Sequence, residues 1–375
     1  MVGLSKFVIL TLTASSVLLG GLLVAKGRDP ETAGAVCPNC TNIKTDAELT
    51  SAVHLAKSGA VLTLAPGARF GLHIFRKVAA SNITVKSADP ARPAVFAGLS
   101  FHDVSGVKLR NLRFEGPVVH MHYKLLFERC RNVDLEGLAF IGDATTYDEP
   151  THSAAMIRWT KSARIHGNRF SRFNAGLTML TVSDVEVSDN SFTDMRVDGI
   201  RGGGISNAII RRNQAVNFHP YPDDHPDGIQ LWTTNETVAA RNILIEDNLV
   251  VRGTGGAIQG IFIRDEVGTL PYQNLTLRGN LVVGALYNGI TAMGIDKAVI
   301  DGNIVLPNPD QASWIRIEMA RNTIMTNNRA GAYITKGQIK QSKSSLINAT
   351  SKPAKTIRQW AQLHNMEPLS DGESN

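Results

Sequence analysis

RIHGN (residues 164–168) is the first of six short apolar-alternating runs that end in asparagine. The other five are VEVSDN (185–190), IIRRN (209–213), ILIEDN (243–248), LTLRGN (275–280) and AVIDGN (298–303). Successive asparagines are 22, 23, 35, 32 and 23 residues apart, so a unit near 22 residues repeats and is lengthened twice. Such a period indicates a repeat architecture, in which each unit is too small to bury a core alone and must stack on its neighbours.

Short alternating strands extend on both sides of these runs, from about residue 82 to about residue 328. A unit of this length fits three short strands and three turns, and a turn asparagine tolerates the left-handed backbone and bonds to its neighbours. The period and the asparagine ladder resemble the right-handed parallel β-helix of the pectate-lyase-like superfamily, over roughly residues 43–330. The resemblance implies an all-β fold, a single-stranded right-handed parallel β-helix in which asparagines of successive coils bridge to one another.

A helix is expected before the first strand, in TDAELTSAVHLAKSG (45–59). Thr45 or Asp46 can cap it, Glu48 lies near its first turn, and Gly59 ends it. This opening helix resembles the N-terminal cap of the same family of folds.

Changes of composition divide the chain into four parts. Residues 1–26 contain an uninterrupted uncharged run from Phe7 to Ala25, so they form either a signal peptide or a membrane anchor. We therefore expect an exported protein that is periplasmic, secreted or held at the membrane by its N-terminus. The other parts are a linker (27–42) whose Cys37 and Cys40 form a small disulfide or are idle thiols, the β-helix (43–335), and a C-terminal cap and tail (336–375).

The charge pattern bears on the partner. The net charge of +6 is spread along the chain, without a block rich in Lys or Arg, which argues against nucleic-acid binding. A mildly basic surface does suit an acidic polysaccharide, through long-range attraction. We therefore expect an acidic polysaccharide as the partner.

A second element recurs after the asparagines: AGLTML, DGIRGG, DGIQLW, GAIQGIF and NGITAM. Aligning these segments gives one apolar column, formed by Ile200, Ile229, Ile258 and Ile290, which we expect to face the core. Since side chains alternate along a strand, the next residues face outward as a polar row: Arg201, Gln230, Gln259 and Thr291. Coils roughly 4.8 Å apart would present this row as a groove with about one sugar per coil.

The chain exceeds its basic unit beside this row. The longest insertion contains HPYPDDHPDGIQ (219–230), and two further extensions are TTNETVAARN (233–242) and RDEVGTLPY (264–272). In the β-helix polysaccharide enzymes that the chain resembles, the cleft lies on this sheet between such loops. We therefore expect the functional site here.

The longest insertion contains the groups that a uronate lyase or C5-epimerase needs. Such an enzyme removes the proton at C5, which requires a base that works near neutrality, and histidine is such a base. His225 is the candidate base, and Asp224 and Asp227 can orient its ring. Arg201 is the candidate group that neutralises the substrate carboxylate as negative charge develops, and Tyr221 is the candidate acid.

Other outward-facing and loop residues are candidates for binding the sugar chain: Gln230, Gln259, Trp232, Arg264 and His219. Gln230 would share the substrate carboxylate with Arg201. The reaction itself requires no cofactor. If calcium neutralises the substrate instead, its candidate ligands are the carboxylates of Asp223, Asp224 and Asp227.

Two shorter segments support the same class of chemistry. DDHPD (223–227) resembles the Asp-Pro-His-Asp element of β-helix mannuronan C5-epimerases, with the proline after the histidine instead of before it. ADPARPAVFAG (88–98) is similar to the first coils of alginate- and chondroitin-lyase-type β-helices. Those families use a Lys and Arg pair for catalysis, which the sequence does not place.

Two other classes stay open. Asp223, Asp224 and Asp227 could act as paired carboxylates of a glycoside hydrolase. The pattern of β-helix polygalacturonases, with separate Asn-Thr-Asp, Asp-Asp and Gly-His-Gly elements on successive coils, is absent from the sequence. A non-catalytic β-helix that binds polysaccharide or serves as a surface scaffold would carry the same repeats. Convergence separates the classes: an enzyme is favoured if His225, Arg201 and Gln230 point into one groove, and a binding or scaffold protein is favoured if His225 faces away or is covered by the loop 264–272.

Overall fold

The computed structural model describes residues 41–116, 122–148 and 152–369. These residues belong to the unit Val36–Asn375, and the other unit, Met1–Ala35, lies outside them. The expected signal peptide or anchor (residues 1–26), most of the linker, Cys37 and Cys40 therefore also lie outside the described residues. Within the described ranges, none of the helices has the length and apolar character to cross a bilayer.

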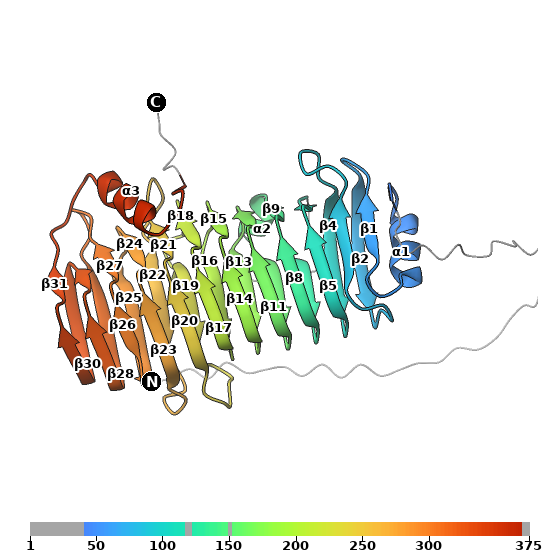
Figure 1. The fold of residues 1–375 in the computed structure, drawn as a ribbon. Coiled ribbons are helices and arrows are strands. Elements are labelled where there is room, and N and C mark those ends of the chain that lie inside the picture. The colour runs from blue at the N-terminus through green and yellow to red at the C-terminus, as the bar shows by residue number, and fades with distance from the viewer. Residues whose placement is uncertain (1–40, 117–121, 149–151, 370–375) are drawn as a thin grey trace, which may run out of the picture. The chain divides into compact units, whose positions relative to one another are not determined.

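Three parallel sheets run along a stack of coils, because each strand pairs with the equivalent strand one coil later (Figure 1). The first sheet contains β2 (Arg69–Arg76), β4 (Val95–His102), β7 (Tyr123–Glu128), β10 (Ser153–Arg158), β13 (Ala175–Leu180), β16 (Asp198–Gly203), β19 (Asp227–Trp232), β22 (Gln259–Arg264), β25 (Tyr287–Asp296), β28 (Ser313–Thr326) and β30 (Ala332–Ser342). The all-β parallel β-helix expected from the sequence is confirmed.

The second and third sheets complete each coil. The second contains β1 (Val61–Leu64), β3 (Ile83–Ser87), β5 (Ser105–Arg110), β8 (Arg131–Glu136), β11 (Lys161–His166), β14 (Ser183–Ser188), β17 (Ser206–Arg211), β20 (Arg241–Glu246), β23 (Tyr272–Arg278) and β26 (Val299–Asp301). The third contains β6 (Arg113–Phe114), β9 (Ala139–Ile141), β12 (Arg169–Ser171), β15 (Ser191–Thr193), β18 (Gln214–Val216), β21 (Leu249–Val251), β24 (Leu281–Val283), β27 (Ile304–Leu306), β29 (Arg329–Ala330) and β31 (Ser345–Leu346).

Stacked rows of like residues fill the interior of the coils. Phe114, Phe140, Phe170 and Phe192 form one such row, with successive ring centroids 4.7 Å apart. This distance equals the spacing of neighbouring strands, so equivalent positions of adjacent coils bring flat rings into contact. The core is therefore continuous from coil to coil instead of being divided between repeats.

The recurring asparagines form a buried ladder. The side-chain Nδ2 of each member donates to Oδ1 of the next at 2.9–3.0 Å, along Asn168, Asn190, Asn213, Asn248, Asn280, Asn303 and Asn328. The same Oδ1 also accepts the backbone N–H of the preceding asparagine. The ladder thus satisfies polar groups that the turns would otherwise bury without partners.

The N-terminal helix α1 (Asp46–Leu55) covers the first coil, as the sequence predicts. The hydroxyl of Thr45 accepts the backbone N–H of Glu48, and the Glu48 carboxylate accepts the backbone N–H of Thr45. This capping box fixes the helix start, and the helix buries Leu49 and Val53 against the core.

The C-terminal region differs from the prediction. The coils continue past residue 335, because β30 and β31 are coil strands. Helix α3 (Ala354–Leu363) does not cover the open end of the stack but packs on the outer face of the third sheet, beside β21 and β24 (Figure 1). Its Trp360 donates to the carbonyl of Gly279 at 2.7 Å, and the amide of Gln214 on β18 bonds to the backbone of Glu367 and Leu369. The apolar outward side chains of the third sheet explain this docking, since the open end offers mostly exposed polar residues.

Candidate functional site

The outward row of the first sheet differs from the prediction at one coil. The register places one isoleucine from each coil in the inward column, namely Ile200, Ile229, Ile261 and Ile290. Phe262 therefore follows Gln230 in the outward row, and Gln259 aligns with Asp227 at the start of its strand. The prediction aligned Ala-Ile-Gln (257–259) with the other coils, whereas the structure aligns Gly-Ile-Phe (260–262) with them. Both triplets have an isoleucine in the centre and fit the alternation of the strand, so only the length of the preceding turn distinguishes the two alignments.

His225 and Asp227 meet at the start of β19. Nδ1 of His225 lies 2.9 Å from Oδ2 of Asp227, and the amide of Gln230 donates to the same oxygen at 3.0 Å. The side chain of His225 is 52% exposed, whereas that of Asp227 is fully buried. A solvent-accessible imidazole thus rests on a buried carboxylate, and such a contact fixes the orientation of the ring.

The other ring nitrogen of His225 also has a partner. Its Nε2 lies 2.6 Å from Nε2 of Gln259, and Oε1 of Gln259 accepts a hydrogen bond from Asn288 at 2.5 Å. The ring of Phe262 meets the imidazole edge to face, with centroids 5.1 Å apart. Gln259, expected to bind substrate, therefore contacts the candidate base instead.

A second buried carboxylate shapes the electrostatics of this pair. Asp198 lies one coil earlier, and its Oδ1 accepts the backbone N–H of Asp227 at 3.2 Å. Burial raises the pKa of Asp227 to about 7 and that of Asp198 to about 6. The hydrogen bond from His225 to Asp227 is the main reason that the pKa of His225 is raised, although burial opposes it. The protonation states of His225 and Asp227 are therefore coupled.

Arg201 lies in the outward row beside Gln230 and forms an ion pair with Asp198 on its own strand. Its guanidinium lies 3.3 Å from the Asp198 carboxylate and donates to the hydroxyls of Thr178 and Ser153 at 3.0 and 3.3 Å. These partners span three coils. Three of the five N–H donors of the guanidinium are thus engaged and the Arg201 side chain is 20% exposed, so the direct contact between Arg201 and a substrate carboxylate stays a prediction.

A pocket of about 270 Å³ opens on the same sheet beside the pair. Its lining comprises Gln230, Leu231, Trp232, Thr234, Phe262, Arg264 and Glu266. Phe262 joins the pocket to His225 through the ring contact described above. Arg264 is exposed, and its side chain has no hydrogen bond or ion pair to any residue that the structure describes. The pocket thus combines an aromatic surface with one basic side chain, Arg264, and one acidic side chain, Glu266, and Arg264 is the group in it that could pair with an acidic sugar.

The loop before β19 places Asp224 and Tyr221 in a separate cluster. Arg196 donates to both carboxylate oxygens of Asp224, at 2.8 and 3.0 Å, and its guanidinium lies 4.1 Å from the centre of the Tyr221 ring. The Tyr221 hydroxyl donates to Asp148, at the end of the short helix α2 (Ala144–Asp148), at 2.5 Å, which raises the pKa of Tyr221. Asp224 therefore does not orient His225, and the engaged hydroxyl of Tyr221 is poorly suited to donate a proton at the pair.

The predicted calcium ligands and His219 are also dispersed. Asp224 is held by Arg196, Asp227 is buried beneath His225, and His219 lies 3.3 Å from Asp194 in the loop. Within the described ranges, no group of three or more His, Cys, Asp or Glu side chains could hold a metal ion. Asp223, Asp224 and Asp227 thus do not form a calcium site.

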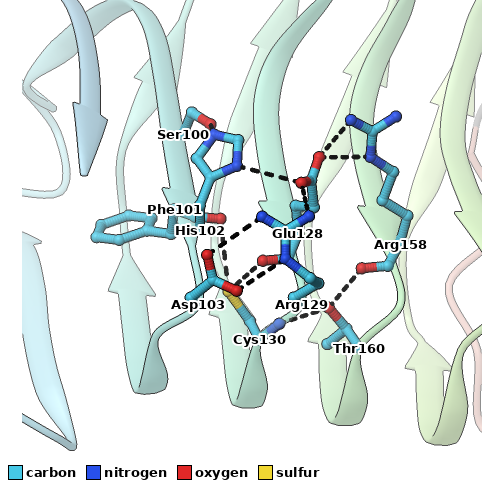
Figure 2. Close-up of polar contacts among 9 residues, drawn as sticks. All are labelled: Ser100, Phe101, His102, Asp103, Glu128, Arg129, Cys130, Arg158 and Thr160. Atoms are coloured by element: carbon cyan, nitrogen blue, oxygen red, sulfur yellow. Dashed lines mark hydrogen bonds and ion pairs between the residues drawn. The ribbon is translucent and has the colours of Figure 1, made fainter. Parts of the chain in front are cut away.

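A second polar cluster lies on the first sheet at the ends of β4, β7 and β10 (Figure 2). The Glu128 carboxylate accepts hydrogen bonds from Arg129 and Arg158 and lies 3.6 Å from Nδ1 of His102. Nε2 of His102 is 2.6 Å from the hydroxyl of Ser100. The order Ser–His–Glu is that of a hydrolytic triad, but Ser100 is only 1% exposed and the two arginines occupy Glu128. The cluster therefore holds three coils together and does not present a nucleophile.

Sequence reasoning missed Asp198 and Asn288. A signal for Asp198 was present, because DGI begins both β16 and β19 and so predicts two aspartates one above the other. The same signal was present for Asn288, because NGI (288–290) stands where DGI stands in β16 and β19. Its importance depends on the exact register of β22 and β25, which the sequence left ambiguous.

Comparison with known proteins places these features in context. Residues 97–305, more than half of the chain, match the family described as right handed beta helix region. No curated protein matches the chain. The solved structure of an alginate lyase from Paenibacillus sp. str. FPU-7 is similar, with a TM-score of 0.53 and 15% identity over 82% of this chain and 99% of that one.

Two further structures share the architecture. A variant of DFA-IIIase from Arthrobacter chlorophenolicus A6, in complex with DFA-III, has a TM-score of 0.51 and 9% identity over 85% of this chain and 89% of that one. The A-module of a mannuronan C-5 epimerase from Azotobacter vinelandii has a TM-score of 0.49 and 15% identity over 81% of this chain and 85% of that one. At these identities the likeness shows the fold alone.

Proposed function

This chain belongs to the right-handed β-helix family, and from that membership and the site we propose that it acts on an acidic polysaccharide. The proposed reaction is abstraction of the C5 proton of a uronate, as in a polysaccharide lyase or a C5-epimerase. Export by residues 1–26, as a cleaved signal peptide or a retained anchor, is part of the proposal, since polysaccharides of this kind lie outside the cytoplasm. A structurally similar protein is an alginate lyase, which agrees with a uronate substrate.

The His225–Asp227 pair is the observation that carries this proposal. A C–H group beside a carboxylate is a weak acid, so its removal needs a base that is neutral near pH 7 and held in place. His225 is half exposed, is oriented by a buried carboxylate and borders a pocket that contains Arg264. In this arrangement Arg264 would stabilise the negative charge that develops on the substrate carboxylate.

The same geometry disfavours hydrolysis by the aspartates. A glycosidase acid must touch the glycosidic oxygen, and its partner must lie on the opposite side of the bond. Asp198 and Asp227 are buried and Asp224 is occupied by Arg196, so Asp223 is the one exposed carboxylate among the three predicted aspartates. A purely binding or scaffold role does not require a buried carboxylate beneath a half-exposed histidine, so the convergence of His225, Asp227 and Gln230 supports an enzyme.

The test is a substrate screen of the purified full-length protein against alginate, pectate, glycosaminoglycans and bacterial exopolysaccharides. A lyase produces unsaturated uronates, seen as rising ultraviolet absorbance. An epimerase without lyase activity incorporates deuterium at C5 in heavy water, seen by NMR. If neither signal appears with any of these polymers, the proposed reaction is wrong, and a reducing-end assay on the same samples separates a hydrolase from a scaffold.

Replacing Arg264 with methionine should weaken substrate use. A charge-assisted hydrogen bond contributes about 1.5–3 kcal/mol, so we expect kcat/KM to fall by about ten- to a hundredfold. The matched control is Arg241→Met, which removes an exposed arginine from β20 on the second sheet and should leave kcat/KM unchanged. Equal losses in both variants would mean that Arg264 acts only through the overall charge of the protein.

The pH dependence should report the His225–Asp227 pair. Only the neutral imidazole can accept the C5 proton, and Asp227 raises the pKa of His225 by stabilising the imidazolium. We therefore expect kcat/KM to rise with pH through an apparent pKa above the ordinary histidine value. In Asp227→Asn this stabilisation is lost, so the midpoint should move to lower pH. A pH–rate profile measures both, and an unmoved midpoint would contradict the pairing.

A further inference from the structure

We propose that Trp314, Asn288 and Gln259 form a directional hydrogen-bond relay that holds His225 as a neutral ring with its proton on Nδ1. The three are positioning residues, because among these four residues only His225 would touch the substrate. The relay deepens the proposed function, and its catalytic meaning rests on that function. Its existence does not, since the position of a proton on the ring can be measured without substrate.

The direction of the relay is set at Trp314. The indole Nε1–H can only donate, and it lies 3.2 Å from Oδ1 of Asn288. The hydroxyl of Thr291 donates to the same oxygen at 3.1 Å. The atom that receives both donors must be an acceptor, so the Asn288 amide has its oxygen on this side and its nitrogen on the other. Stacking on Tyr287, with centroids 5.1 Å apart, holds the indole in place.

Gln259 transmits this direction to the histidine. Nδ2 of Asn288 donates to Oε1 of Gln259 at 2.5 Å, so Gln259 presents its nitrogen to His225, 2.6 Å from Nε2. A contact between two nitrogens is a hydrogen bond only if one carries the proton and the other offers a lone pair. An amide nitrogen only donates, and therefore Nε2 of His225 is the acceptor.

The opposite side of the ring leads to the same assignment. A neutral imidazole with a lone pair on Nε2 has its proton on Nδ1, and Nδ1 lies 2.9 Å from Oδ2 of Asp227. Gln230 also donates to that oxygen at 3.0 Å, which marks it as an acceptor. Nε2 of Gln230 also lies 3.5 Å from Nδ1, but its bond to Oδ2 of Asp227 is shorter, at 3.0 Å, and Nδ1 is closer still to Oδ2. The shorter contacts at both ends of the network thus favour the Nδ1–H tautomer, whose Nε2 is the basic nitrogen.

The relay opposes the carboxylates that surround the ring. Asp227 and the more distant Asp198 favour the imidazolium, and Arg201 offsets part of the charge of Asp198. Protonation of Nε2 would set its N–H against the N–H of Gln259. Turning the Gln259 amide would move the conflict to Asn288, and turning Asn288 would set its nitrogen against the indole N–H. Protonation therefore costs the relay at least one hydrogen bond, which keeps the base neutral over a wider pH range.

The relay also has a consequence for binding. Nε2 offers one lone pair in the plane of the ring, and the Gln259 amide occupies it. A substrate C–H group can reach that lone pair only after the amide gives way. Gln259 thus protects the basic nitrogen from water-borne protons until the substrate replaces it.

Two variants break the relay in different ways. In Asn288→Asp both oxygens accept, so the Gln259 amide should turn and present its oxygen to Nε2, which favours a proton there. In Trp314→Phe the donor is removed without adding charge, so Asn288 is free to turn. We expect the titration midpoint of His225 to move to higher pH in both, and further in Asn288→Asp. The control Asn235→Asp makes the same change in the exposed turn after β19 and should leave the midpoint unmoved.

The measurement is nitrogen-15 NMR of the full-length protein labelled at histidine, followed with pH. Protonated and lone-pair ring nitrogens resonate far apart, and the signals of His225 are those missing from His225→Gln. Nδ1 protonated and Nε2 unprotonated near neutrality, with the midpoint raised in both variants, would support the relay. A wild-type proton on Nε2, or variants that titrate as the wild type does, would overturn it. If only the substrate screen fails, the hydrogen-bond relay is still supported and the proposed uronate reaction is wrong. If only the NMR result fails, the relay is wrong and the proposed reaction is unaffected.

Discussion

His225→Gln should lower kcat/KM for the uronate reaction by roughly a thousandfold, since general base catalysis contributes about 10²–10⁴ to a rate. Glutamine can still accept a hydrogen bond but cannot take the C5 proton. Asp227 cannot replace the lost base, because it is fully buried beneath the ring. The residual rate would come from Arg264 and the pocket, which bind and polarise the substrate but do not remove the proton.

The matched control is His54→Gln, which makes the same substitution on the exposed face of α1. We expect this variant to retain the wild-type kcat/KM. Steady-state rates at saturating and low substrate separate a loss of chemistry, which lowers kcat, from a loss of binding, which raises KM. A variant of His225 that keeps kcat and only raises KM would assign the histidine to binding and leave the base unidentified.

Asn248→Ala should destabilise the protein by roughly 3–5 kcal/mol, because it removes the centre of the buried asparagine ladder. Its Oδ1 accepts from the backbone and side chain of Asn213, and its Nδ2 donates to Asn280 and to the carbonyl of Ile210. Alanine leaves these groups without partners in a region closed to water. A shift of the urea midpoint, followed by circular dichroism, measures the loss.

Asn242→Ala is the matched control, because it removes an asparagine from a second, exposed ladder. There Asn242 donates to Asn207 at 2.9 Å and accepts from Asn274 at 3.0 Å, and water can replace both bonds. Its left-handed backbone, with a φ of 56°, adds a cost of roughly 1–2 kcal/mol for alanine. Asn248 is not among the residues with a positive φ, so equal destabilisation by both variants would mean that loss of the buried ladder bonds costs no more than the backbone strain at residue 242.

The fold could be predicted because the repeat near 22 residues is marked by asparagines, and the structure requires an asparagine at the same turn of successive coils. From Asn168 to Asn328 the buried turn of each coil uses an amide that both donates and accepts, and so asparagine returns at each of these turns. The capping box of Thr45 and Glu48 likewise marks its helix in the sequence. The docking of α3 could not be predicted, because outward residues of the third sheet such as Leu281 look like core residues in the sequence.

The site could be predicted only where neighbours in sequence are neighbours in space. His225, Asp227 and Gln230 lie on one strand and its entry, and the structure brings them together. Asp224 was grouped with them for the same reason, but a loop lets adjacent residues face different partners, and Arg196 from an earlier coil binds it.

The segment after β31 folds back over earlier coils of the third sheet, and this arrangement determines which end of the stack unfolds first. In a linear array the end coils normally fray first, since each has a neighbour on one side only. Here the chain leaves β31 and crosses the third sheet, and its residues Glu367 and Leu369 contact Gln214, several coils earlier. We therefore expect the last coil to unfold only after α3 has dissociated from the third sheet, which includes breaking the bond from Trp360 to Gly279. Unravelling should start at the α1 end, and the described C-terminal segment acts as a clasp that keeps the coils of the His225 site closed for longest.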